Sequence, residues 1–108
     1  MIDTIVIGGR QTGRTTRMIK KAAENNIYIV VANRARAYTI AEMARRMGLS
    51  IPFPVTVWEL QQKNLIGRRD IREVYIDDAD AVLEQFVGTH VSYINLENPI
   101  PIRPSEGK

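Results

Sequence analysis

The stretch Gly8-Gly9-Arg10-Gln11-Thr12-Gly13-Arg14-Thr15-Thr16 decides how the rest of this chain is interpreted. It follows a short apolar run at residues 4–7 and precedes a segment with helical spacing. A strand, a glycine-rich loop and a helix, in that order, are typical of a phosphate-binding loop, because the backbone N–H groups at the helix N-terminus face the anion. The spacing fits G-x-x-x-x-G-K-[ST] except at Arg14, which stands in place of lysine. An ordinary glycine-rich turn is the alternative.

The composition is that of one globular domain without disulfides. The chain has 108 residues, of which 44% are hydrophobic and 25% charged, and it contains no cysteine. This length supports one core but leaves no room for a second domain. A chain without cysteine has no disulfides or thiolate metal sites, which favours a cytoplasmic location, or the host cell cytoplasm for a viral protein. The apolar runs are too short to span a bilayer, so we expect no membrane partner.

The charge is distributed unevenly along the chain. Residues 10–72 carry 13 Lys and Arg against 4 Asp and Glu, whereas residues 73–108 carry 2 against 7. A basic region followed by an acidic one favours a polyanion near the first part, either a nucleotide or a nucleic acid such as DNA. A solvated surface with arginine-rich helices is the simpler alternative.

Strands and helices are predicted to alternate. The predicted strands cover residues 3–8, 27–32, 55–58, 73–78 and 89–95, and the predicted helices cover residues 14–24, 35–47, 59–65 and 79–87. This alternation predicts an α/β fold: a three-layer sandwich with a mainly parallel sheet of about five strands and helices on both faces. We expect a nucleotide-binding domain over residues 1–95 and an extended, proline-rich tail over residues 96–108.

Helical spacing also predicts which side chains point inward. The expected core positions are Met18, Ile19, Ala22, Ala23, Ile40, Met43, Ala44, Met47, Val82, Leu83 and Phe86. The expected helix ends are Asn25-Asn26, Gly48 and Gly88, because these residue types tolerate left-handed backbone angles. Arg36, Arg45 and Arg46 are expected to point to solvent.

Three signals are predicted to meet at the carboxyl edge of the sheet. They are the glycine-rich loop, the pair Asp77-Asp78 after one strand, and Asn95 at the end of another. Right-handed crossovers place ligand chemistry at this edge. Thr15 and Asp77 are of the type that holds Mg²⁺, and Asp78 is placed to activate a water. Asp78 as the N-cap of the next helix is an alternative that is compatible with this role.

Together, the loop and the sequence Val-Tyr-Ile-Asp-Asp-Ala-Asp resemble the Walker A and Walker B motifs of P-loop NTPases. The acidic pair is similar to the branch with an additional catalytic acid, which contains RecA-like ATPases, helicases and viral packaging motors. The resemblance implies ATP or another NTP, Mg²⁺, a link to phage DNA processing or packaging, and a homo-oligomer. It implies nucleotide binding by Gly8, Gly9, Arg10, Gln11, Thr12, Gly13, Arg14, Thr15 and Thr16, with Arg14 and Asp78 catalytic, Thr15 and Asp77 on the metal, and Asn95 as a sensor.

The chain departs from that family pattern at three points. Arg14 replaces lysine, Asp78 replaces the commoner and longer glutamate, and the chain has no second lobe. The first two departures leave hydrolysis open. The leading hypothesis is therefore an NTP-binding protein with Mg²⁺-dependent hydrolysis. The alternatives are a non-hydrolysing nucleic-acid-binding or regulatory module on a P-loop-derived scaffold and, less favoured, a small-molecule phosphotransferase.

Other residues have competing interpretations. Arg68, Arg69 and Arg72 are candidates to act in trans on a neighbour's nucleotide, or they form a solvated loop. Trp58 is expected in the core or over the sheet edge, with base stacking as the alternative. His90 is expected to be structural or at the surface. The segment 33–36 follows a strand at a place where helicase-like proteins contact DNA.

Overall fold

Three short parallel strands form the centre of the fold. The computed structural model describes residues 2–7, 13–62 and 71–97. The strands are β1 (Ile29–Val31), β2 (Val55–Thr56) and β3 (Tyr75–Ile76), and they lie in the order β2-β1-β3. In the register, Val30 stands opposite Val55 on one side and opposite Ile76 on the other. The described residues therefore have the parallel sheet that the sequence predicts, with three strands.

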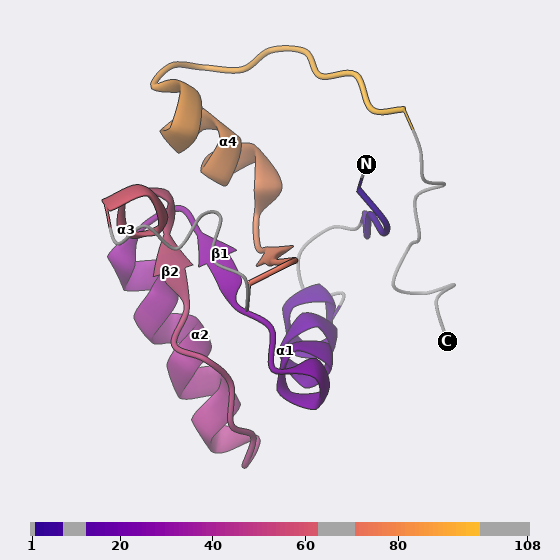
Figure 1. Cartoon of the computed structure of the whole chain (residues 1–108), viewed down its shortest axis with the longest axis vertical. Helices are drawn as coiled ribbons and strands as arrows, with labels where there is room; N and C mark the ends of the chain where they lie inside the picture. The colour runs from indigo at the N-terminus through magenta and orange to yellow at the C-terminus, as the bar shows by residue number, and fades with distance from the viewer. Residues whose placement is uncertain (1, 8–12, 63–70, 98–108) are drawn as a thin grey trace.

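Four helices alternate with these strands (Figure 1). They are α1 (Arg14–Asn25), α2 (Arg34–Arg46), α3 (Val57–Gln62) and α4 (Ala79–Val87). The left-handed residue Asn26 ends α1, as predicted. Gly88, with φ 86°, ends α4. Three of the helices begin and end within one residue of the predicted limits.

The helices cover both faces of the sheet. On one face, α1 and α2 pack on Ile29 and Val31 of β1, through the buried side chains Ile19, Ala22, Ala37, Ile40 and Ala44. On the other face, Val30 and Val55 form a smaller core with Val82 of α4, flanked by Val57 and Leu60 of α3. Because successive residues of β1 point to opposite faces and all three are buried, β1 is the shared centre of three layers.

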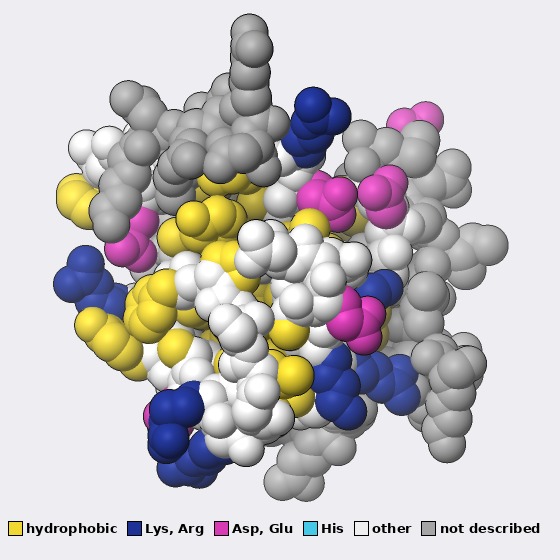
Figure 2. All heavy atoms as spheres, turned by 60° about the horizontal axis from the view of Figure 1, so that its bottom comes forward, with side chains coloured by type: hydrophobic (Ala, Val, Ile, Leu, Met, Phe, Trp, Pro, Cys, Tyr) yellow, Lys and Arg dark blue, Asp and Glu magenta, His cyan; other side chains and the backbone are white. Residues whose placement is uncertain are grey.

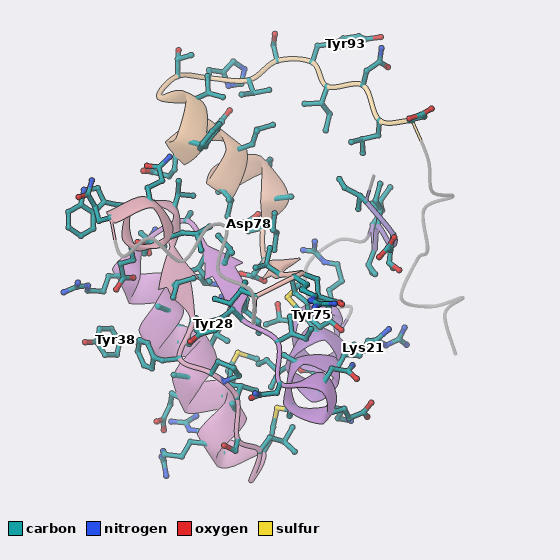
Figure 3. All side chains as sticks on the ribbon, viewed as in Figure 1. Lys21, Tyr28, Tyr38, Tyr75, Asp78 and Tyr93 are labelled. Atoms are coloured by element: carbon teal, nitrogen blue, oxygen red, sulfur yellow. The ribbon has the colours of Figure 1, made fainter. Side chains whose placement is uncertain are left out.

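Two of the five predicted strands are not strands in the described residues. Residues 2–7 contain a single bridge residue, Val6, and residues 89–97 have no regular structure. Figure 1 shows the segment 89–97 passing outside α4, and Figure 3 shows Tyr93 on it pointing away from the sheet. Tyr93 is 82% exposed. The β-branched and aromatic composition favours a strand, but a strand also needs a partner for its backbone groups.

Two aromatic side chains also lie outside the core, contrary to expectation. Phe86 is 61% exposed and Trp58 is 63% exposed. Val82 alone on α4 is fully packed against the sheet, because the smaller core on this face has few strands to cover it. The view in Figure 2 shows hydrophobic side chains gathered in the middle of one face, with Lys and Arg side chains around them in separate groups beside acidic ones. The described Lys and Arg side chains on that face do not join into one patch.

None of the helices in the described part of the chain is long and apolar enough to cross a membrane.

Candidate functional site

Thr15, Arg36 and Asp77 form a hydrogen-bonded cluster that joins three distant parts of the chain. Thr15 Oγ1 donates to Asp77 Oδ1 at 3.4 Å. Arg36 Nε donates to Asp77 Oδ2 at 2.7 Å, and Arg36 Nη2 donates to Thr15 Oγ1 at 3.2 Å. A longer contact of 3.5 Å joins Arg36 Nη2 to Asp77 Oδ1. The guanidinium therefore contacts both of the other side chains at once.

The fold places these residues at one edge of the sheet. Asp77 directly follows β3, and its backbone N–H donates to Val30 O of β1 at 3.0 Å. Thr15 lies in the first turn of α1, after Gly13, whose φ of 78° turns the chain into the helix. Arg36 lies in the first turn of α2, which follows β1, and its backbone N–H donates to the N-cap side chain of Asn33 at 2.8 Å. All three come from the carboxyl side of the parallel strands.

The ion pair at the centre of this cluster joins a buried carboxylate to a partly exposed guanidinium. The side chain of Asp77 is 6% exposed and that of Arg36 is 36% exposed. Asp77 is the one charged or polar residue among the buried ones that the structure describes. The hydrogen bond to Asp77 raises the pKa of Arg36, with a further contribution from the charges of Asp77 and Asp78. A carboxylate this deep in the protein requires such a partner, because its desolvation is otherwise uncompensated.

Asp78 and Asp80 form a second acidic pair beside the cluster. A hydrogen bond to Asp80 raises the pKa of Asp78, and burial and the charges of Asp80 and Asp77 raise it further. The same bond lowers the pKa of Asp80, as do backbone N–H groups and the charge of Arg14. The two carboxyl groups therefore share a proton more readily than isolated ones. Arg14 is thus close enough to act on this pair electrostatically.

The predicted N-cap role of Asp78 is only half present. Asp78 occupies the N-cap position of α4, but its side chain makes no capping hydrogen bond. Its backbone is left-handed, with φ 58°, which non-glycine residues adopt at a cost. Figure 3 shows Asp78 between α4 and the end of the sheet. Its carboxyl group therefore interacts with the side chain of Asp80 in the first turn of α4 rather than with the backbone N–H groups of that turn.

The structure brings some of the predicted site residues together and not others. Thr15 and Asp77 meet, as the motifs predict, and Arg14 and Asp78 lie beside them. Asn95 is exposed on the segment 89–97, which does not join the sheet. Arg72 is exposed before β3. The predictions for Gly8, Gly9, Arg10, Gln11, Thr12, Arg68 and Arg69 lie outside the described residues.

Arg36 is the main site residue that the sequence interpretation missed. It was expected to point to solvent, but its guanidinium turns inward to Asp77. A signal was present in the sequence: Arg36 stands in the first turn of a helix that has no acidic residue there. The positive end of the helix dipole disfavours a cation at that position, so a carboxylate from elsewhere was to be expected. His90, in contrast, is exposed as predicted, and its Nδ1 lies 2.9 Å from Glu84 Oε2.

The expected magnesium ligands can be compared with this geometry. The Thr15 hydroxyl and the Asp77 carboxylate are oxygen donors of the type that Mg²⁺ prefers. The guanidinium of Arg36 already donates to both groups. Within residues 2–7, 13–62 and 71–97, no group of three or more His, Cys, Asp or Glu side chains could hold a metal ion. The donor types therefore fit, but a cation of the protein itself is bonded to them.

A pocket of about 380 Å³ lies where α2 begins and where α3 and α4 approach each other. The exposed rings of Trp58 and Phe86 line it, together with the polar side chains of Asn33 and Arg34. Arg34 Nη2 lies 4.0 Å from Glu59 Oε2 on the same wall. Aromatic rings and polar side chains therefore line the same pocket.

Comparison with known proteins returned no matching family model, no matching curated protein and no matching solved structure.

Proposed function

We propose that this chain binds a nucleoside triphosphate, with ATP as the first candidate, where α1 begins and β3 ends. The observation that carries the proposal is the 3.4 Å contact between Thr15 Oγ1 and Asp77 Oδ1. The two residues are 62 positions apart, and each was singled out by a separate motif. A phosphate-binding loop requires this juxtaposition of a helix-starting hydroxyl and a strand-ending carboxylate.

The start of α1 has the chemistry that phosphate groups need. Gly13 ends a glycine-rich stretch and, as the N-cap residue, has no side chain that could cap the first N–H groups of α1. These groups and the helix dipole favour an anion. The exposed Arg14 adds a guanidinium, which bonds phosphate oxygens in pairs. When bound, Mg²⁺ would be held by Thr15 and Asp77 and would neutralise charge on the phosphates.

The proposal includes a P-loop type of sheet and hydrolysis. In it, the segments 3–8 and 89–95 are added to the three-stranded sheet, which gives five strands. Asp78 accepts the proton of a water that attacks the γ-phosphate, and the bond to the β-phosphate oxygen breaks. A raised pKa suits this role, because a base is most effective when its pKa approaches the working pH. The reaction would serve DNA processing or packaging in a phage.

Nucleotide binding is tested by calorimetry with ATP and ADP on three proteins. The wild type is expected to bind. Thr15→Val removes the hydroxyl but keeps the shape, and we expect it to weaken ATP binding about tenfold, the factor of one lost hydrogen bond to a charged group. Thr39→Val is the matched control, because the exposed Thr39 hydroxyl bonds to Ala35 O within its own helix. A wild type that binds neither nucleotide at millimolar concentration contradicts the proposal.

Hydrolysis is measured separately, as phosphate release by the wild type and by Asp78→Asn. Asparagine tolerates the left-handed backbone at this position but cannot accept a proton from water. We expect turnover to fall at least 100-fold while ATP binding persists. Turnover that is equal in both proteins excludes Asp78 as the base. A wild type that binds ATP without turnover favours the non-hydrolysing alternative.

A non-hydrolysing nucleic-acid-binding module is the second candidate, and the pocket beside α2 favours it. Trp58 and Phe86 expose rings on which an unpaired base can stack, and Arg34 adds positive charge. The described Lys and Arg side chains in Figure 2 lie in separate groups rather than along one track, which ranks this candidate second. Salt-sensitive binding of a single-stranded oligonucleotide without ATP turnover would move it to first place.

A further inference from the structure

Thr15 and Asp77 already contact one cation, which belongs to the protein itself. Two of its oxygens lie 3.4 Å apart, close enough for one small cation to contact both. The group that contacts both is the guanidinium of Arg36, through Nε to Asp77 at 2.7 Å and through Nη2 to Thr15 at 3.2 Å. A divalent cation needs the same lone pairs. Arg36 and the divalent cation therefore exclude each other at these atoms.

The position of Arg36 allows its guanidinium to leave Thr15 and Asp77. It belongs to the first turn of α2, three residues after the N-cap Asn33, where the helix dipole repels positive charge. Asp77, with a contribution from Asp78, supplies the negative charge that holds it. The side chain is 36% exposed, so an exit to solvent is open. Its attachment thus depends on Asp77 rather than on its own helix.

We infer that Arg36 is the resident cation of this site and that a divalent cation binds Thr15 and Asp77 only when the guanidinium leaves. A nucleotide gives the guanidinium a second place to bind, because phosphate oxygens accept paired N–H bonds as a carboxylate does. A metal-free phosphate ligand brings no cation to Thr15 and Asp77, so Arg36 can stay bonded to them. A metal-bound nucleotide brings a divalent cation, which must replace the guanidinium at these atoms. The role of the nucleotide rests on the proposed function. The competition between the two cations does not.

The test measures Mn²⁺ binding to the full chain without nucleotide, by the electron paramagnetic resonance signal of free Mn²⁺. We expect Arg36→Gln to bind Mn²⁺ at least about tenfold more tightly than the wild type, since a charge-assisted bond no longer competes. The double variant Arg36→Gln/Asp77→Asn is expected to lose that gain. Arg34→Gln is the matched control, because it removes the same charge from the same helix end without touching Thr15 or Asp77.

Two results of the Mn²⁺ measurement overturn the inference. One is equal Mn²⁺ affinity in the wild type and in Arg36→Gln; the other is an equal gain in Arg34→Gln and Arg36→Gln, which makes the effect one of net charge. Arg36→Gln leaves the buried carboxylate of Asp77 without its partner, which destabilises the fold. A second measurement is therefore made on the wild type. The Nε–H resonance of Arg36 should move toward that of a solvated guanidinium as Mg²⁺ is added. Mg²⁺ bound to Asp77 with this resonance unmoved contradicts the exchange. A failure of ATP to bind leaves both measurements intact and sinks the proposed function alone.

Discussion

Asp77→Asn is the substitution whose cost the structure defines best. It keeps the shape of the side chain but removes the charge and places an amide near the guanidinium of Arg36. The carboxylate accepts a short bond of 2.7 Å from Nε at one oxygen and a weaker one of 3.5 Å from Nη2 at the other, and asparagine keeps only one of these two acceptors. Breaking a fully buried pair costs about 3–5 kcal/mol, and a hydrogen bond to a charged group contributes about 1.5–3 kcal/mol. Because Arg36 is 36% exposed and regains water, we expect about 2 kcal/mol.

The assay is urea unfolding followed by circular dichroism, arranged as a double-mutant cycle with Arg36→Met. We expect a coupling free energy of about 1.5–3 kcal/mol between the two positions. A loss of 2 kcal/mol also lowers the melting temperature by roughly 8–16 °C in a domain of this size. Glu42→Gln is the control, since Glu42 pairs with Arg45 and Arg46 at the surface, where water screens the charges, and it is expected to cost less stability than Asp77→Asn. Equal effects of Asp77→Asn and Glu42→Gln would refute the reasoning.

Three further predictions concern other parts of the chain. First, the hydrogen bond from Arg45 lowers the pKa of Glu42 to about 2. The stabilising contribution of the ionised Glu42 is therefore complete above the unfolded pKa of about 4.5 and is lost as the pH falls toward 2. An NMR titration of Glu42 with a midpoint near 4.5 contradicts this prediction. Second, Gly88→Ala is expected to cost about 1–2 kcal/mol in thermal unfolding, because Gly88 has a φ of 86° that alanine adopts only with strain. The cost does not come from a clash, since a Cβ at this position meets no atom within 4 Å. Gly88→Asn is expected to cost less, and equal losses in the two variants argue against backbone strain as the cause. Trp58 is the single tryptophan and is 63% exposed, so acrylamide should quench its fluorescence readily and a bound oligonucleotide should protect it; protection by ATP alone would assign the pocket to the nucleotide instead.

The limits of α1, α2 and α4 were predictable from the sequence because local signals set them, whereas α3 begins at Val57, inside the predicted strand 55–58. The apolar spacing of α4 and its stop at Gly88 give residues 79–87, the limits that the structure has. Asn26 ends α1 for the same local reason, a residue type that tolerates left-handed angles. The face of α2 that packs inward also follows from spacing, since Ile40 and Ala44 are buried as predicted. These features need no knowledge of distant parts of the chain.

Features that depend on distant partners were predicted less well. The segment 89–95 has the composition of a strand, but composition does not say which strand it would pair with. Phe86 follows the helical spacing yet is exposed, because the face that it points to carries few strands. Arg36 was misjudged because its partner is 41 positions away. Thr15 and Asp77 were paired correctly only because two motifs with a joint chemical role identified both.

The junction between β2 and α3 has a mechanical consequence. β2 ends at Thr56 and α3 begins at Val57, with no connecting loop. Thr56 and Glu59 form a reciprocal capping box, in which the N–H of Glu59 donates to Thr56 Oγ1 at 3.1 Å and the N–H of Thr56 donates to Glu59 Oε1 at 3.1 Å.

Because no loop separates β2 from α3, a rotation of the helix is transmitted directly to the strand. A ligand in the pocket that displaces Trp58 therefore also displaces β2 relative to β1. In the register of these two strands, Val31 stands opposite Thr56. The amide of Thr56 donates to Glu59 Oε1 in the capping box, so its hydrogen-exchange rate reports whether a ligand at the pocket wall opens this junction.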